Sequence, residues 1–346
     1  MPFEWLTSLE LSSITGDASQ GGYAATISFY NSQEDAPTYR ELSLYHLNFS
    51  GTSWEASHRM AMKGVIIPQS ISVDRGTSLT TASVYTFHQP LSFIPVSGCY
   101  FEDSAAGNNA HQINNLSLGL VVKHLAEHHV TVTPGGIDTT QIDTAGSTAI
   151  TPYIVRENAS LWAAMKKVAS DEFYAIYFDR QNRLVYKCHP QFAGAVPAAV
   201  ATLDADNLMA PYSVEFRTGR KAKNVLLLGL NNDMEVLEST YPAGAGVDVR
   251  GPRFEVRCNT QARLDVLAER QYKWLNRDYT ATLTLPGAWN IELYDHVKVT
   301  LSGTTTNGVT FNWTDKSFWV HRVNYRKVTK GAYGYITELT LEEGYV

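Results

Sequence analysis

The chain reads Thr282-Leu283-Thr284-Leu285-Pro286-Gly287 and, shortly after, Leu293-Tyr294-Asp295-His296-Val297-Lys298-Val299, and this stretch decides the fold. Its first part alternates polar and apolar residues and stops at Pro-Gly, which is typical of a half-buried strand ending in a turn. Its second part predicts another strand over residues 297–301. Upstream, Asn259 or Thr260 can cap a helix whose one side carries Leu264, Leu267, Ala268, Gln271, Trp274 and Leu275.

The N-terminal part of the chain also has the pattern of strands. Ala25, Ile27 and Phe29 alternate with polar or aromatic neighbours, and residues 82–87 alternate again. Ile71 and Val73 lead into Asp74-Arg75-Gly76, a plausible turn. This segment is interpreted as a β-barrel or sandwich, or a large part of one.

A different pattern separates the two β-rich ends. Leu118, Val121, Val122 and Leu125 recur at helical spacing, with Ser117 as an N-cap candidate. Ser160 starts a second predicted helix, whose apolar face carries Leu161, Ala164, Met165 and Val168. Two strands, 173–178 and 183–186, flank Asp179-Arg180-Gln181-Asn182 and predict a hairpin.

The predicted fold class is α+β with β dominant: two β-barrel domains with a small α/β domain between them. The expected boundaries are residues 1–98 for the first barrel region, 99–203 for the insert, and 204–346 for the second barrel region with its connecting helix. The Gly- and Pro-rich residues 242–252 are predicted to form a long loop.

The amino-acid composition excludes several classes of function. The 346 residues carry a net charge of −6, with 11% aromatic and 18% charged residues, which fits a folded, strand-rich protein. The acidity argues against a general nucleic-acid-binding surface. Cys99, Cys188 and Cys258 form no metal or disulfide pattern. Neither a secretory signal nor a membrane span is expected, so a soluble protein made in the cytoplasm is predicted.

One enzymatic pattern needs weighing. His124-Leu125-Ala126-Glu127-His128 has the H-x-x-E-H spacing of an inverted zinc-peptidase helix, in which two histidines bind zinc and the glutamate is the base. On a helix, however, Glu127 lies nearly opposite the apolar stripe, the histidines lie on the flank, and no third ligand can be named. A solvated helix flank is preferred, with a zinc-dependent hydrolase as the alternative; adventitious metal binding helped by His129 and His111 stays open.

Other chemical patterns are weaker. No nucleophile elbow, phosphate loop, dinucleotide fingerprint or EF-hand loop is present. The adjacent carboxylate pairs Asp171-Glu172 and Glu342-Glu343 are interpreted as exposed charges. The aromatic residues of 311–319 are expected to serve core packing and subunit contacts rather than sugar or base stacking. No catalytic, cofactor-binding or metal-binding residue is therefore assigned, and a binding or structural role is favoured.

The order of elements resembles the baseplate or tail-tip hub proteins of tailed phages, to which the N-terminal part of type VI secretion spikes is related. The resemblance rests on the helix-then-hairpin around Ser160-Leu161-Trp162 and Phe173-Tyr174-Ala175, and on residues 262–301: a helix, a strand ending in Pro-Gly, and the entry to Val297. The late strand Trp319-Val320-His321-Arg322-Val323 also fits. Tyr294 stands where the family commonly has a glycine before Asp295, so a different turn is expected there.

The resemblance implies a non-enzymatic homotrimer whose six barrel domains form a pseudo-sixfold ring. Such a hub would adapt a hexameric tail tube to a threefold spike or fibre and let DNA pass, without sequence-specific nucleic acid binding. The implied partners are the tail tube or distal tail protein, the spike, fibre or tip protein, and a tape measure protein. The implied location is the tail tip or baseplate of a virion, assembled in the host cytoplasm.

Overall fold

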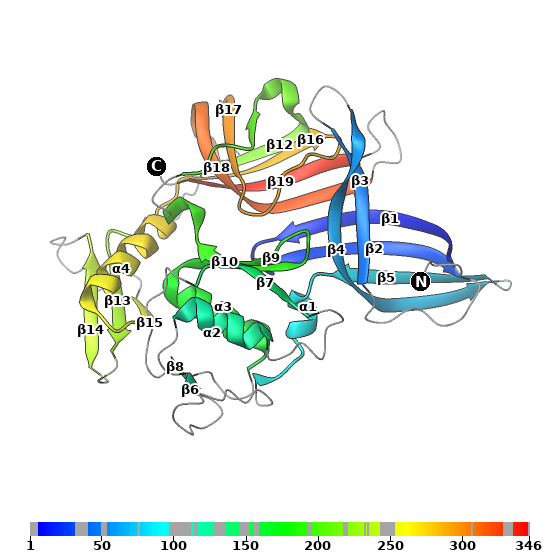
Figure 1. Cartoon of the computed structure of the whole chain (residues 1–346). Coiled ribbons are helices and arrows are strands. Elements are labelled where there is room, and N and C mark those ends of the chain that lie inside the picture. The colour runs from blue at the N-terminus through cyan, green and yellow to red at the C-terminus, as the bar shows by residue number, and fades with distance from the viewer. Residues whose placement is uncertain are drawn as a thin grey trace.

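A computed structural model describes most of the chain. The described residues are 6–31, 41–49, 54–74, 77–96, 112–113, 117–127, 136–144, 153–154, 159–192, 196–216, 221–231, 233, 235–242, 253–305, 307–327 and 335–344. Strands dominate them, so the α+β, β-dominant class is confirmed (Figure 1). Cys99 and residues 243–252 of the predicted loop lie outside the described residues.

The strands fall into one large and three small sheets. The large one contains β1 (Leu6–Asp17), β2 (Gly22–Asn31), β3 (Glu41–Phe49), β4 (Trp54–Asp74), β5 (Thr77–Tyr85), β11 (Ala201–Leu203), β12 (Met209–Phe216), β16 (Tyr279–Pro286), β17 (His296–Thr304), β18 (Thr310–Lys327) and β19 (Tyr335–Glu343). The small ones contain β6 (Gln112–Ile113) with β8 (Tyr153–Ile154), then β7 (Asp138–Ile142), β9 (Tyr174–Phe178) and β10 (Arg183–Cys188), and finally β13 (Val225–Leu230), β14 (Val236–Tyr241) and β15 (Arg253–Arg257).

Four α-helices are found among the described residues: α1 (His88–Leu91), α2 (Leu118–Glu127), α3 (Leu161–Glu172) and α4 (Gln261–Leu275). Short 3-10 turns cover Pro190–Phe192 and Ala205–Asn207. The predicted caps are confirmed, because the hydroxyl oxygens of Ser117, Ser160 and Thr260 accept hydrogen bonds from backbone amides in the first turns of α2, α3 and α4.

The large sheet, called the main sheet below, joins the two ends of the chain. Its order is β12-β16-β19-β18-β1-β2-β5-β4-β3, and β17 pairs with both β18 and β11. The join is the antiparallel pair β1–β18, where Ile14 lies opposite Tyr325. The β17–β18 turn reaches β12, since Asn307 Nδ2 donates to the Phe216 carbonyl at 2.6 Å. No closed barrel is found among the described residues, so the two-barrel arrangement stays a prediction.

Residues 282–286 lie in β16 and residues 297–301 lie in β17, as expected. Leu283 and Leu285 are fully buried, while Gly287 takes a φ of 80° at the turn, a conformation that favours glycine. Tyr294 has a φ of 63°. It therefore adopts the left-handed conformation that a glycine would favour, and the expectation of a different turn stays a prediction. Its ring packs 4.9 Å from that of Tyr177, a contact that offsets the backbone strain.

Two smaller units adjoin the main sheet (Figure 1). The α2–α3 unit comprises α1, α2, α3, β7, β9 and β10 around its own apolar core, and the two faces of β9 divide between cores: Ile176 and Phe178 face this one, whereas Ala175 and Tyr177 belong to the core of the main sheet. The α4 unit comprises α4 and β13–β15, packed around Leu227, Leu264 and Leu267. The predicted domain boundaries at 98/99 and 203/204 stay predictions.

Candidate functional site

The H-x-x-E-H residues lie at the end of α2. Leu118, Val122 and Leu125 are buried, Glu127 is exposed, and His124 is half-buried on the flank. Glu127 Oε1 accepts from the Thr139 hydroxyl at 3.1 Å and lies 3.6 Å from Lys123 Nζ. His128, His129 and His111 lie outside the described residues. Within the part of the chain that the structure describes, no three His, Cys, Asp or Glu side chains gather as metal ligands, so the zinc alternative gains no support.

The interpretation of the carboxylate pairs as exposed charges is wrong for Asp171 and Glu172, which are 2% and 3% exposed. Both lie in the last turn of α3, where a side chain can turn inward toward basic partners: Asp171 pairs with Lys167, and Glu172 with Arg263 at 3.1 Å. Glu342 and Glu343 are likewise largely covered, at 15% and 13% side-chain exposure. The core role of the aromatic stretch is confirmed, since Phe311, Trp313 and Phe318 are buried in the main core.

Among the described residues, a dense polar site is built on the β9–β10 turn. Asn182 closes this turn with a φ of 61°, and its amide donates to the Asp179 carbonyl at 2.9 Å. The Asp179 carboxylate accepts from the amides of Gln181 and Arg183, both at 2.9 Å, and from Arg183 Nε at 2.6 Å. Because hydrogen bonds within the turn fix its backbone, the side chain of Arg180, in the middle of the turn, leaves it in one direction.

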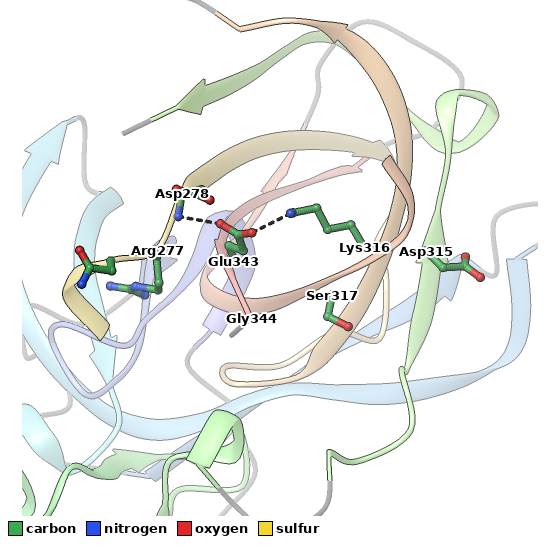
Figure 2. Close-up of a pocket in the computed structure, with 8 residues that line it drawn as sticks. Arg277, Asp278, Asp315, Lys316, Ser317, Glu343 and Gly344 are labelled. Carbon is green, nitrogen blue, oxygen red and sulfur yellow. Dashed lines mark hydrogen bonds and ion pairs between the residues drawn. The ribbon is translucent and has the colours of Figure 1, made fainter. Parts of the chain in front are cut away.

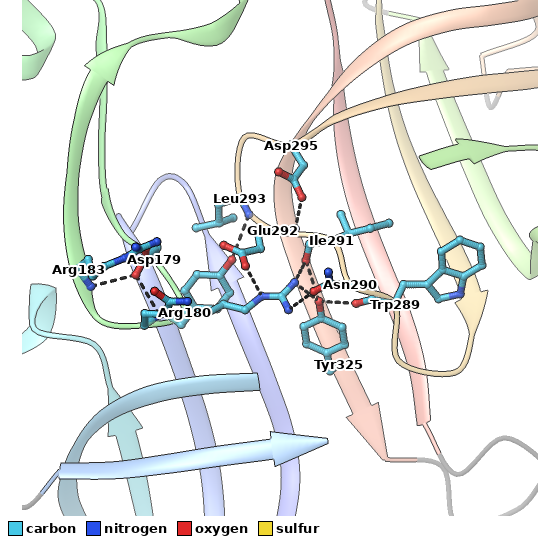
Figure 3. A network of polar contacts seen from close by, with 12 residues as sticks. Asp179, Arg180, Arg183, Trp289, Asn290, Ile291, Glu292, Leu293, Asp295 and Tyr325 are labelled. Carbon is cyan, nitrogen blue, oxygen red and sulfur yellow. Dashed lines mark hydrogen bonds and ion pairs between the residues drawn. The ribbon is translucent and has the colours of Figure 1, made fainter. Parts of the chain in front are cut away.

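The side chain of Arg180 crosses into the loop between β16 and β17 (Figure 3). Its Nη2 donates to the Ile291 carbonyl and to the Tyr325 hydroxyl, the latter at 2.8 Å. Its Nη1 donates to Asn290 Oδ1 at 3.2 Å, and its Nε lies 3.5 Å from Glu292 Oε1. The Tyr325 hydroxyl is also 2.7 Å from the Ile291 carbonyl oxygen. The guanidinium therefore supplies hydrogen-bond donors to an irregular loop whose backbone is not paired in a β-sheet.

Backbone bonds tie the same turn to the N-terminal strands. Lys63 N of β4 donates to the Arg180 carbonyl at 2.7 Å, and Phe178 N donates to the Gly21 carbonyl at 2.9 Å. Asn182 Oδ1 accepts from Phe87 N at 2.8 Å. One turn thus contacts both halves of the main sheet.

The contacts that Arg180 makes with the β16–β17 loop and with Tyr325 are called the Arg180 junction below. Burial governs its electrostatics. Arg180 is 2% exposed. Burial disfavours its charge, but Tyr325, Tyr23 and Glu292 raise the pKa of Arg180 above its ordinary value, so it stays charged. Burial raises the pKa of Tyr325 to about 12, so its hydroxyl remains a donor. Burial, followed by the repulsion from Glu292, raises the pKa of Asp295 to about 6, although the Glu292 amide and Arg180 oppose the shift.

A second polar region is an open pocket of about 410 Å³ where α4 meets the main sheet (Figure 2). Its walls include Asn276, Arg277, Asp278, Asp315, Lys316, Ser317, Glu343 and Gly344. Glu343 Oε2 accepts from the amides of Asp278 and Tyr279 at 2.7 and 2.8 Å, while Lys316 Nζ lies 2.6 Å from its Oε1. Arg277 pairs with Glu342. Both cations of the wall, Arg277 and Lys316, are already paired with carboxylates of β19, which favours a structural joint over a ligand site.

Neither described cysteine nor the buried His88 and His189 offer activated chemistry. Burial raises the thiol pKa of both Cys188 and Cys258, the reverse of what a nucleophilic thiolate requires. Burial lowers the pKa of His88 to about 4 and that of His189 to about 3, so both rings are neutral. His189 instead packs edge-on against Trp274 and Tyr294. Among the described residues, no helix is long and apolar enough to span a bilayer.

No protein-family model and no curated protein matches the sequence. Solved structures do match the fold. A tail protein from Neisseria meningitidis MC58 superposes with a TM-score of 0.61 at 16% identity, covering 98% of this chain and 92% of that one. A 43 kDa tail protein of prophage MuSo2 from Shewanella oneidensis gives 0.61 at 12% identity, covering 96% and 97%. The chain has the fold of these tail proteins.

A type VI secretion component shares the fold. The E. coli c3393 protein, described as structurally similar to the T4 bacteriophage tail proteins gp27 and gp5, gives a TM-score of 0.51 at 8% identity, covering 98% of this chain and 74% of that one. The resemblance to the hub family is thus confirmed at the level of fold. Sequence reasoning missed Arg180 as a site residue. It identified the turn, but no local pattern marks an arginine whose acceptors lie about a hundred residues away.

Proposed function

We propose that this chain is a structural component of a phage or phage-like tail, acting as the hub of the tail tip or baseplate. The observation that carries the proposal is the agreement of fold over 98% of the chain with a tail protein, at a TM-score of 0.61. Within the described residues, the strongest polar clusters join parts of the fold and are internally neutralised. That arrangement supports a scaffold rather than an enzyme.

The proposed working form is a homotrimer whose barrel-like regions form a pseudo-sixfold ring. The curved C-terminal strands and the N-terminal strands, linked at β1–β18, would supply the two barrel regions of each subunit. Such a ring would adapt a hexameric tail tube to a threefold spike or fibre. Closed rings also cover strand edges that would otherwise invite uncontrolled pairing.

The proposed partners follow from this position in the tail. The tail tube or distal tail protein would contact one side of the ring, the spike, fibre or tip protein the other, and a tape measure protein the lumen. The net charge of −6 suits a channel through which DNA passes without being gripped, and without sequence-specific recognition. The protein would be assembled in the host cytoplasm and reside in the virion.

Mass measurement by light scattering, combined with negative-stain imaging, tests the proposal. We expect light scattering to give the mass of three 38.4 kDa chains. The averaged images should show a ring with threefold symmetry. An obligate ring should bury more than about 2,000 Å² between neighbours. A chain that stays monomeric at high concentration, and also when mixed with tube and spike proteins, would contradict it.

Deleting residues 243–252 separates assembly from folding. We expect the variant to keep the unfolding midpoint of the intact chain and to bind the tail tube more weakly. Unchanged tube binding would remove this segment from the proposed interface.

A further inference from the structure

The α2–α3 unit and the α4 unit are each connected to the main sheet by the chain itself. β5 leads directly into α1, and β10 is followed through 189–200 by β11, so the α2–α3 unit lies between two strands of the main sheet. The α4 unit likewise lies between β12 and β16. The two units also meet directly, in a contact between residues far apart in sequence that is centred on Glu172 at the end of α3.

The contact is a buried carboxylate held by basic side chains of α4. Glu172 is 3% exposed, and its Oε1 lies 3.1 Å from Arg263 Nη2. Tyr186 of the α2–α3 unit donates its hydroxyl to Glu172 Oε2 at 3.1 Å. Arg270, two turns further along α4, donates from Nη1 to the Glu172 carbonyl at 3.2 Å. The next residue, Phe173, packs against the apolar core of the α4 unit.

The chemistry of this contact differs from that of a domain core. A buried ion pair gains little net stability over an apolar contact of the same shape, because both charges lose water when they meet. Polar contacts between separately cored units also permit relative motion. The buried residues of the two cores are separate sets, and the apolar contact that separation would uncover here is that of Phe173 with the core of the α4 unit.

We propose that Glu172 and Arg263 form a conformational latch between the α2–α3 unit and the α4 unit. In the closed state, the latch fixes the α4 unit against α3. In the open state, both units keep their cores and their connections to the main sheet, and the α4 unit moves about its junction at Arg277. This latch is a property of the single chain and does not depend on the proposed ring.

Hydrogen–deuterium exchange on the full chain tests the latch with Arg263→Met and Glu172→Gln. We expect exchange in the last turn of α3 and in α4 to rise about tenfold or more, since charged hydrogen bonds hold the closed state. Exchange in β16–β19 should not change. Lys273→Met is the matched control, because Lys273 forms a more exposed pair with Glu269 inside α4 at 2.7 Å.

Two results would overturn the latch. One is unchanged exchange at α3 and α4 in both variants. The other is an equal rise across β16–β19, which would make the pair part of the global fold. If Arg263→Met does not fold, Arg263→Lys is used instead, because it keeps the charge but has fewer hydrogen-bond donors. Its exchange in α3 and α4 is expected to be faster than that of the intact chain and slower than that of Glu172→Gln. Exchange equal to that of the intact chain in Arg263→Lys would then count against the latch.

Discussion

The Arg180 junction and the pocket around Glu343 use the same kinds of side chain, yet differ in burial. Arg180 is 3% exposed at the side chain and faces carbonyls, a phenol and Glu292. Lys316 is 28% exposed and pairs with a Glu343 that is 13% exposed. Water can reach the pocket, and it can reach Glu292, which is 41% exposed, but it cannot replace a partner lost by the buried Arg180 guanidinium or the Ile291 carbonyl. Burial, rather than the number of charges, therefore decides which region holds the fold together.

The largest difference is expected for Arg180→Met. It removes the hydrogen bonds from the buried guanidinium to the Ile291 carbonyl, Asn290 Oδ1 and the Tyr325 hydroxyl, so the free energy of unfolding should fall by about 3–5 kcal/mol. Urea titration measures the change. Arg180→Lys keeps the charge but loses the planar fork, and an intermediate loss is expected. If Arg180→Met lowers the free energy of unfolding by no more than the loss of an exposed ion pair does, the contrast between the junction and the pocket would be wrong.

Asp295 gives the junction a pH dependence of defined sign. Because burial raises its pKa from 3.8 to about 6, the folded state binds this proton more tightly than the unfolded chain. Its contribution therefore favours folding increasingly as pH falls from about 6 toward 4, by about 2 kcal/mol in total. In Asp295→Asn this pH-dependent part of the free energy of unfolding should vanish. The test compares unfolding free energies of both proteins at pH 7 and pH 5; identical differences would contradict the assignment.

How far the sequence predicts this molecule depends on the range of each interaction. Helix caps, the β9–β10 hairpin and the Pro286-Gly287 turn depend on neighbours in sequence, and local patterns predicted them. The joining of the chain's two ends could not be predicted, because the β1–β18 pairing brings Ile14 to Tyr325, and nothing near either residue specifies the other. For the same reason the junction was missed: Arg180 finds its acceptors in a loop over a hundred residues later.

Adjacent charges show the same limit. Asp171-Glu172 has the sequence pattern of solvated carboxylates, yet both are buried, because Lys167 and Arg263 neutralise them from the same helix and from α4. Tyr294 shows the opposite case. Its residue type does not predict a left-handed backbone, yet Tyr294 has a φ of 63°, and ring packing against Tyr177 and His189 stabilises the tyrosine.

A smaller effect is expected in the pocket. Lys316→Met removes one partly exposed partner of Glu343, whose carboxylate keeps its two backbone amide donors. The free energy of unfolding should fall by about 1 kcal/mol or less, and less still in high salt. Urea titrations with and without salt measure it. A loss as large as that of Arg180→Met would show that the pocket is as critical to the fold as the junction.

The smallest effect is expected on α2, where charge and exposure coincide. Glu127→Gln removes an exposed contact with Lys123 at 3.6 Å, a pair separated by one helical turn, so stability should change by about 0.5 kcal/mol or less. His124→Ala should also fold, because the apolar face of α2 carries its packing. Elemental analysis of both variants and of the intact chain should give the same, substoichiometric zinc content. One tightly held zinc per chain that disappears in His124→Ala, with peptide cleavage that disappears in Glu127→Gln, would instead establish the hydrolase.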